Sequence, residues 1–354
     1  MRATRQGRIG LREVAQHLGV SPVTVSNAFN RPDQLSAALR ARVLAAAAEL
    51  GYAGPQPAAR MLRTGRAGAI ALYTHDPITH LLRDAHAITF LQGVAAACQE
   101  RQMGLLLLPG AVSGGADLRA IEAAAVDGFL LYALAADQPG VARVLARRLP
   151  VVAVDVGAVA GIATVGIDDR AAAAMAGQHV LALGHRRLAV LSLELLPDGH
   201  DGRAGPERLA AASFAVTRAR WQGLAEAMAA HGLDAAAVPV LEIAGNSRAT
   251  AARLVAGLLW EEPGRRPTAL LAMSDELALG ALDAARALGL AVPGELAITG
   301  FDDTEAAAAA GLTTVRQPAA AKGRVAVEAL LAAEPSEEGL LLPTELVVRR
   351  STSG

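Results

Sequence analysis

Acidic and hydroxyl side chains follow several apolar segments of this 354-residue sequence, at positions where short strands are expected to end. Open parallel sheets bind ligands in the crevice beyond the carboxyl ends of their strands. This rule nominates side chains that can exchange hydrogen bonds with a small polar molecule. They are Thr74, His75, Asp76, Asp155, Ser274, Asp275 and Asp302.

Motifs that would make such a site catalytic do not occur in the sequence. There is no GxSxG elbow, no P-loop, no GxGxxG placed between a strand and a helix, and no HExxH. Asp168 and Asp169 are adjacent carboxylates, but we do not expect them to act as a catalytic pair, because adjacent residues of an extended segment point in opposite directions. The eight histidines lack metal-ligand spacing, and the single Cys98 excludes a disulfide framework and a cysteine-based zinc site. We therefore expect a binding protein that is not an enzyme, with no cofactor and no metal.

The elements that position these side chains alternate between strands and helices. Fully apolar strands that alternate with helices predict parallel sheets covered on both faces, and their number predicts two α/β lobes. The apolar runs lie at 69–73, 104–109, 128–132, 151–155, 187–192, 269–273 and 296–301. The helical stretches between them lie at 86–102, 170–183, 218–231, 247–260 and 275–288.

The first 66 residues follow a different pattern, that of short helices with clear caps. Residues 11–18 have one apolar face and end at Gly19, while Ser21 and Pro22 are an N-cap and a first helical residue. A third helix is expected between Ser36 and Gly51. Two short helices joined by a tight turn, with a third packed across them, are the helix-turn-helix plan.

Charge divides the chain at the same place. The net charge of −1 is the sum of +7 in residues 1–66 and −8 in the other 288 residues. A basic head on an acidic body indicates a polyanion partner, here nucleic acid. The N-terminus has no apolar stretch typical of a secretory signal, and no run reaches the ~18 apolar residues of a membrane helix. We expect a cytoplasmic protein without membrane contact.

The segment VAQHLGVSPVTVSNAFN, followed about twenty residues later by ELGY, resembles the DNA-binding head of the LacI/GalR family of bacterial repressors. The resemblance places the second helix in the major groove of double-stranded operator DNA, with Pro22, Val23 and Asn27 at base edges. Hydroxyl groups can donate hydrogen bonds to phosphates, so we expect Ser21, Thr24 and Ser26 to contact the phosphates of the DNA backbone. The alternative for Asn27 is a solvated helix position. Gly10 departs from the family, which usually has Thr or Ser as the first cap.

Residues 57–66, PAARMLRTGR, match the family's hinge helix. The resemblance implies that Leu62 wedges into the minor groove where two subunits meet, and that Arg60 and Arg63 reach phosphates. An ordinary amphipathic turn would have the same composition.

The rest of the chain resembles the family's core, a relative of periplasmic sugar-binding proteins, through stretches such as VDGFLLY, PVVAVD and ITGFDD. The expected fold is thus an all-α helix-turn-helix head joined by a hinge helix to a two-lobed α/β core with parallel sheets. The predicted domains are a head at 1–56, a hinge at 57–67 and a core at 68–350. Three crossovers would divide the core into a first lobe (68–167 and 302–317) and a second lobe (168–301 and 318–350).

Matching to the family's motifs assigns an effector-binding set. Arg220 occupies the position of the effector arginine, Asp302 and Asp155 those of two carboxylates, and Ser274 one that is often Asn. An arginine facing a carboxylate can bracket vicinal hydroxyls, which suits a sugar-like ligand. Asn246 stands where some members stack an aromatic ring, and the segment THDPITHLLRDAH (74–86) is unusual. With the strand-end rule, the predicted set is His75, Asp76, Asp155, Arg220, Asn246, Ser274 and Asp302.

Each residue of this set has a structural alternative. Asp155 and Asp302 can cap helices, and Arg220 can pair with an acid on its own helix. The sequence as a whole predicts a homodimeric, ligand-responsive repressor that binds a pseudo-palindromic operator. A constitutive DNA-binding protein with a vestigial cleft, and a solute-binding protein, are the alternatives.

Overall fold

The computed structural model describes residues 9–54, 61, 65–110, 118–260, 266–332 and 339–353. The chain divides into two compact units, Met1–Ala67 and Gly68–Gly354. The predicted contacts of Arg60, Leu62 and Arg63, and most of the predicted hinge helix, lie outside the described residues.

The first unit contains the three predicted helices. They are α1 (Leu11–Leu18), α2 (Pro22–Asn30) and α3 (Ala37–Glu49), with a 3-10 turn η1 (Pro32–Gln34) between the last two. The Ser21 hydroxyl accepts from the Thr24 amide at 3.1 Å and caps α2, and Ser36 caps α3 in the same way. Gly19 ends α1 with a φ of 64°. At the cap of α1 the Gly10 amide donates to the Glu13 carboxylate at 3.0 Å, so the helix start keeps one side-chain hydrogen bond without a serine.

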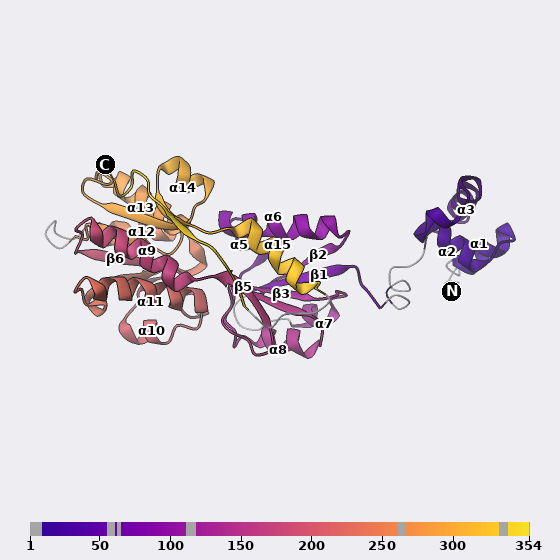
Figure 1. The fold of residues 1–354 in the computed structure, drawn as a ribbon, viewed down its shortest axis with the longest axis horizontal. Helices are drawn as coiled ribbons and strands as arrows, with labels where there is room; N and C mark the ends of the chain where they lie inside the picture. Colours follow the sequence, from indigo (N-terminus) through magenta and orange to yellow (C-terminus); the bar gives the residue numbers. More distant parts are fainter. Residues whose placement is uncertain are drawn as a thin grey trace, which may run out of the picture. The chain divides into compact units, whose positions relative to one another are not determined.

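The second unit contains two lobes, each built on one sheet (Figure 1). Within the described residues the first sheet has six strands in the order β12-β5-β4-β3-β1-β2. Its pairings are all parallel. The strands are β1 (Ala69–Thr74), β2 (Gly104–Leu108), β3 (Phe129–Tyr132), β4 (Val151–Val154), β5 (Ala163–Ile167) and β12 (Leu340–Leu342). The helices are α5 (Ile78–Leu81), α6 (Ala85–Glu100), α7 (Arg119–Ala123), α8 (Pro139–Ala146) and α15 (Ala319–Leu330).

The second sheet has seven strands among the residues described, in the order β13-β11-β10-β9-β6-β8-β7. The strands are β6 (Leu188–Ser192), β7 (Gly202–Arg203), β8 (Val240–Glu242), β9 (Ala269–Ala272), β10 (Ala297–Asp302), β11 (Thr313–Arg316) and β13 (Glu345–Val347). The helices are α9 (Asp169–Ala182), α10 (Pro206–Ala210), α11 (Ala215–Ala230), α12 (Arg248–Leu259), α13 (Asp275–Ala287) and α14 (Glu305–Ala310). The short edge strands β7 and β13 pair antiparallel with their neighbours.

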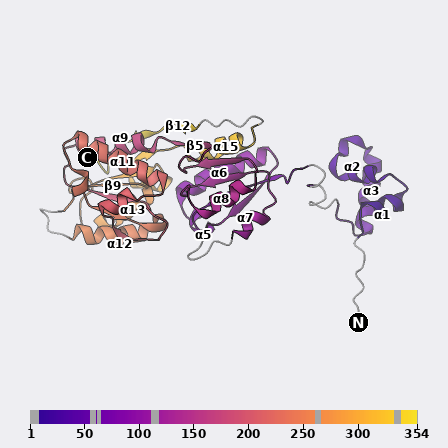
Figure 2. The same ribbon diagram turned by 90° about the horizontal axis from the view of Figure 1, so that it is seen from below.

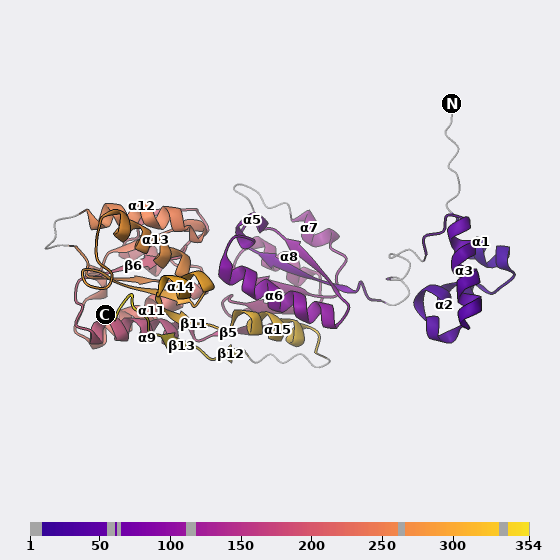
Figure 3. The ribbon, with the colours of Figure 1, turned by 90° about the horizontal axis from the view of Figure 1, so that it is seen from above.

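Helices cover both faces of each sheet. In the second lobe α9 and α11 lie on one face and α12 and α13 on the other (Figure 2). In the first lobe α6 and α15 lie side by side, although more than 200 residues separate them in the sequence (Figure 3). The predicted fold class, a helical head with a two-lobed core of parallel sheets, is confirmed. Across the described ranges, no helix has the length and apolar character needed to cross a bilayer.

The predicted assignment of the C-terminal segments to the lobes is wrong. Residues 302–317 were expected in the first lobe, but β11 pairs in parallel with β10 of the second lobe. Residues 318–350 were expected in the second lobe, but α15 packs on α6 and β12 pairs with β5 of the first. The short α14 connects β10 to β11 as a local crossover, and this keeps both strands in one sheet. The chain first crosses to the second lobe between β5 and α9. It returns to the first lobe after β11 and crosses again between β12 and β13.

Close helix packing makes Gly223 of α11 a sensitive position. A Cβ atom there would lie 2.0 Å from the backbone oxygen of Arg170 in α9. Gly223→Ala is expected to lower the free energy of unfolding by roughly 1–3 kcal/mol, because the two helices must separate. Gly257 of α12 is the matched control, since a Cβ there meets no atom within 4 Å. Gly257→Ala should raise the stability by about 0.5–1 kcal/mol. Urea denaturation measures both, and equal effects of the two variants would contradict this packing.

Candidate functional site

A cavity of about 170 Å³ lies between the two lobes of the second unit. We call it the interlobe cavity. Its lining includes all seven residues predicted to bind an effector, and the structure therefore brings together side chains that are up to 227 positions apart in the sequence. They are His75, Asp76, Asp155, Arg220, Asn246, Ser274 and Asp302. Thr74 and Asp275, nominated by the strand-end rule, are fully buried and do not line the cavity.

Strand ends supply the predicted carboxylates. Asp155 directly follows β4, and Asp302 is the last residue of β10. Both have positive φ angles, 54° and 127°, where the backbone turns sharply out of the sheet. Ser274 follows β9 and caps α13 by accepting from the Leu277 amide at 3.2 Å. These positions agree with the rule that places ligands beyond the carboxyl ends of parallel strands.

Arg220 is buried in α11 and already has partners inside the protein. Its Nε donates to the Asp169 carboxylate at 2.8 Å, and its Nη1 donates to the carbonyl oxygen of Met273. The guanidinium lies 3.6 Å from the ring centroid of Phe301. The alternative in which Arg220 pairs with an acid on its own helix is wrong, because Asp169 is the first residue of α9.

Asp155 is held by a lysine from the other end of the chain. Lys322 of α15, the single lysine of the sequence, donates to both oxygens of Asp155 at 2.9 and 2.8 Å. It also donates to the Gln317 side chain at 2.8 Å. Asp155 accepts from this lysine and does not cap a helix, so the capping alternative is wrong for it.

Asp302 combines the two predicted roles. It accepts from Gln317 Nε2 at 2.6 Å and faces the cavity. It also accepts, at 3.5 Å, from the backbone amide of Asp275 at the start of α13, which is a weak capping contact. Burial and the neighbouring Asp275 raise the pKa of Asp302 well above its usual range.

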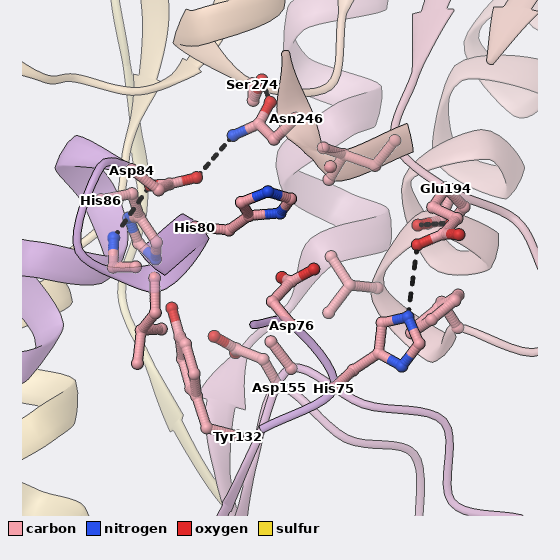
Figure 4. A pocket seen from close by; sticks show the side chains of 18 of the residues that line it. His75, Asp76, His80, Asp84, His86, Tyr132, Asp155, Glu194, Asn246 and Ser274 are labelled. Atoms are coloured by element: carbon pink, nitrogen blue, oxygen red, sulfur yellow. Dashed lines mark hydrogen bonds and ion pairs between the residues drawn. The ribbon is translucent and has the colours of Figure 1, made fainter. Parts of the chain in front are cut away.

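Within the described ranges, three polar bridges cross the cavity, and all start from the segment 75–86 of the first lobe. Figure 4 labels His75, Asp84 and His86, from which they start. Asn246 Nδ2 of the second lobe donates to Asp84 at 2.6 Å, and Asn246 Oδ1 accepts from Ser274 at 2.5 Å. His75 Nε2 lies 3.5 Å from Glu194 Oε2. His86 Nδ1 lies 3.5 Å from Asp302 Oδ1. The segment that the sequence marked as unusual therefore connects the two lobes.

The sequence did not predict several other residues that line the cavity. They are His80, Leu81, Asp84, His86, Ala87, Tyr132, Ala133, Leu193, Glu194, Phe214, Val216, Thr217, Gly245 and Gln317. Four of them, His80, Leu81, Asp84 and His86, belong to the segment THDPITHLLRDAH, whose dense histidines and acids were a usable signal. Despite this density, no three His, Cys, Asp or Glu side chains in the described ranges are arranged to hold a metal ion.

Protonation of His75 should strengthen its bridge. The Glu194 carboxylate raises the pKa of His75 above the ordinary 6.5, and Asp76 and Gln138 add to the effect against burial. The stabilisation is therefore present below pH 6.5 and is lost as the pH rises through the raised pKa. Glu194→Gln should lower the free energy of unfolding by up to about 1 kcal/mol at low pH, and should change it little at pH values above the raised pKa of His75. Urea denaturation of both proteins across the neutral range measures this difference, and a difference that stays constant with pH would contradict it.

The polar face of α2 carries the residues predicted to contact DNA. Val23 is 66% exposed, and Asn27 Nδ2 donates to the Gln34 side chain at 3.2 Å. The hydroxyls of Ser21 and Thr24 lie 2.9 Å apart, and Asn30 donates to the Ser26 hydroxyl at 3.3 Å. Pro22 is the first residue of the helix. These side chains lie at or near the surface, while Val25 and Ala28 on the opposite face are fully buried.

The fold and the cavity together define a class of proteins with a helix-turn-helix head and a two-lobed, ligand-binding type of core. Comparison with known proteins gives the same division. Residues 10–54 match the family of bacterial regulatory proteins, lacI family, and residues 178–352 match a periplasmic binding protein-like domain. The HTH-type transcriptional regulator Rv3575c of Mycobacterium tuberculosis is 46% identical over 364 aligned positions, which cover 100% of this chain and 99% of the relative. The chain belongs to the LacI family of HTH-type transcriptional regulators.

Two solved structures are similar over nearly the whole chain. The Lac repressor dimer bound to operator and the anti-inducer ONPF has a TM-score of 0.75 at 26% identity, covering 97% of this chain and 99% of that one. The complex of the transcriptional regulator CelR with cellobiose has a TM-score of 0.66 at 29% identity, covering 97% and 100%.

Proposed function

We propose that this regulator is a repressor that binds a pseudo-palindromic operator as a homodimer and is controlled by a small, sugar-like effector in the interlobe cavity. The observation that carries the proposal is the convergence of polar side chains from both lobes on one cavity, with three bridges between the lobes. The solved relatives, one a dimer on its operator and one with a bound sugar, support both halves of it.

The bridges suggest how an effector would act. Asp84 and His86 lie at the first turn of α6, and Asn246 lies just before α12. A ligand that contacts both lobes changes the separation between them. The first lobe, which is joined to the head through the chain, then changes its position relative to the second lobe. A coupling of ~1–3 kcal/mol is typical of such control and changes DNA affinity about 5- to 150-fold.

In this proposal the head reads DNA through α2. Pro22 and Val23 offer apolar contact to thymine methyls, Asn27 bonds an adenine, and Ser21, Thr24 and Ser26 bond phosphates. Leu62 wedges into the minor groove, and Arg60 and Arg63 beside it reach phosphates, as the family resemblance implies.

We infer further that the cavity binds its ligand without transforming it. The Ser274 hydroxyl donates to an amide oxygen, and the Thr217 hydroxyl donates to the carbonyl of Glu194 at 2.9 Å. Neither hydroxyl is bonded to a histidine that could activate it as a nucleophile.

Asn27→Ala is expected to weaken binding to the specific operator by ~1–3 kcal/mol and to relax the preference for one base pair in each half-site. Gln34→Ala is the matched control, because it breaks the same Asn27–Gln34 hydrogen bond and leaves the Asn27 amide in place. Fluorescence anisotropy with operator variants measures both proteins. If Asn27 acts only through Gln34, the two variants will lose affinity equally and keep the base preference.

The effector half of the proposal is tested by combining thermal unfolding with DNA binding. The probes are sugars, sugar phosphates and nucleosides, and the DNA is the region upstream of the protein's own gene. A specific ligand at 100 times its Kd adds about 2.7 kcal/mol of stability. We expect any ligand with this effect also to change DNA affinity at least fivefold. Tight DNA binding that no ligand changes would instead indicate a constitutive DNA-binding protein.

A further inference from the structure

Carboxylates outnumber free cations around the interlobe cavity. Asp76 points into it (Figure 4), and no residue in the described ranges donates a hydrogen bond to its carboxylate. Among the residues that the structure describes, Asp84 accepts only from neutral donors, the Asn246 amide and the backbone N–H of Ala87. Glu194 has His75 as its facing cation when that histidine is protonated. Burial raises the pKa of Asp76, and the nearby Glu194 and Asp84 add to the rise against His75 and His80.

The permanent cations near the cavity are already neutralised. Arg220 is paired with Asp169 at 2.8 Å, and Lys322 is paired with Asp155 at 2.8 Å. Lys322 is fully buried behind Asp155 and does not line the cavity. In the described part of the chain, therefore, neither cation offers the open charge with which proteins bind phosphates and carboxylates.

Tyr132 also lies close to the carboxylates of the cavity. Its side chain is 4% exposed, stacks on Phe90 at 4.2 Å and points its hydroxyl into the cavity (Figure 4). The hydroxyl has no hydrogen-bond partner within the described part of the chain. Burial raises the pKa of Tyr132 well above 10, and the carboxylates of Asp155, Asp84, Asp302 and Asp76 raise it further. Tyr132 is therefore a protonated hydrogen-bond donor and acceptor surrounded by carboxylate acceptors.

We infer that the effector is a hydroxyl-rich molecule without phosphate or carboxylate groups, and that the acidic side chains of the interlobe cavity exclude anionic relatives of the same molecule. Hydroxyl groups donate to the open carboxylate of Asp76 and exchange hydrogen bonds with Tyr132 and His80. A phosphate or carboxylate in the same place loses its water and meets charges of its own sign. The inference rests on the proposed effector site and adds the charge of the ligand to it.

The test uses matched sets of ligands that differ only in charge: a hexose or cyclic polyol, its amine, its phosphate ester and its acid. Isothermal calorimetry with the full chain measures each. We expect the neutral member or the amine of at least one set to bind, with the phosphate and the acid weaker by at least about tenfold. A phosphate or acid that binds as well as its neutral counterpart overturns the inference and leaves the effector site standing. Failure of every member of every set overturns the effector site as well.

A charge variant shows whether the carboxylates cause the exclusion. Asp76→Asn keeps the shape of the side chain and removes one negative charge. It should therefore reduce the ratio of the Kd of the phosphate ester to the Kd of the neutral ligand about tenfold. Asp137→Asn makes the same charge change at an exposed position of the first lobe that does not line the cavity. It should leave this ratio unchanged. If the two variants behave alike, local charge in the cavity is not the cause, and the inference is wrong.

Discussion

Arg220→Ala is expected to lower the free energy of unfolding of the two-lobed unit by about 3–5 kcal/mol. The cost arises because Asp169, only 9% exposed, loses the cation that neutralises it. Trp221 and Trp260, the two tryptophans of the chain, both lie in this unit, so their fluorescence in urea reports its unfolding. Arg218→Ala on the same helix is the control. Arg218 is exposed and, within the described residues, donates only to the carbonyl of Ala212, so a loss of stability within about 1 kcal/mol is expected.

A double variant separates the structural part of Arg220 from its part in ligand binding. Arg220→Ala/Asp169→Asn removes both charges and should recover much of the lost stability. It should not recover the change in DNA affinity on adding effector, because the guanidinium that faces the cavity is still missing. A double variant that regains the full response would remove Arg220 from the effector site, and a single variant as stable as the wild type would contradict the buried pair.

Lys322→Met is expected to cost a similar 3–5 kcal/mol. Lys322 is fully buried, and its ammonium joins Asp155 after β4 to Gln317 at the crossover between the lobes. Without it, the carboxylate of Asp155, whose side chain is 10% exposed, has no counter-ion. The double variant Lys322→Met/Asp155→Asn should restore most of the stability, since asparagine tolerates the positive φ of this position.

Arg324→Met provides the comparison on the same helix. Arg324 pairs with Glu100 at the surface, where ion pairs contribute about 0–1 kcal/mol. Urea denaturation of the four proteins therefore distinguishes a buried charge network from general sensitivity of α15. Equal losses for Lys322→Met and Arg324→Met would contradict the network.

The parts of the structure that local chemistry determines were predictable from the sequence. Serine caps and glycine stops define the three helices of the head, and apolar runs between glycines and prolines define the central strands. The polar residues after these strands converge in the cavity because parallel strands end at one edge. The core is filled mainly by Ala, Leu and Val, and the spacing of these apolar residues was sufficient to predict the central strands.

Strand β11 shows what the local pattern cannot supply. Its sequence, TTVR, has no apolar run, and its threonines are buried because partners from distant segments satisfy them. Thr314 donates to Asp275 at 2.6 Å, and the Thr313 amide donates to the Ser351 hydroxyl at 2.8 Å. This polar strand was missed, and the crossover between the lobes was consequently placed too early.

The bridges between the lobes depend entirely on tertiary structure. The bridge between Asp84 and Asn246 joins residues 162 positions apart, and the ion pair of Asp155 and Lys322 within the first lobe joins residues 167 positions apart. Motif matching predicted that Arg220 and Asp155 face a ligand, but it could not predict that each is already neutralised by an internal partner. The pairing of Arg220 with Asp169 removes a cation that could have balanced Asp76 and Asp84, and this leaves the cavity acidic.

The most direct test of the account is selection of binding sites from random double-stranded DNA by the full chain, in parallel with Asn27→Ala. The wild type should enrich a two-fold symmetric sequence, and the variant should lose its preference at one base pair in each half-site. Enrichment of no sequence, or of a single asymmetric site read equally well by the variant, would contradict it.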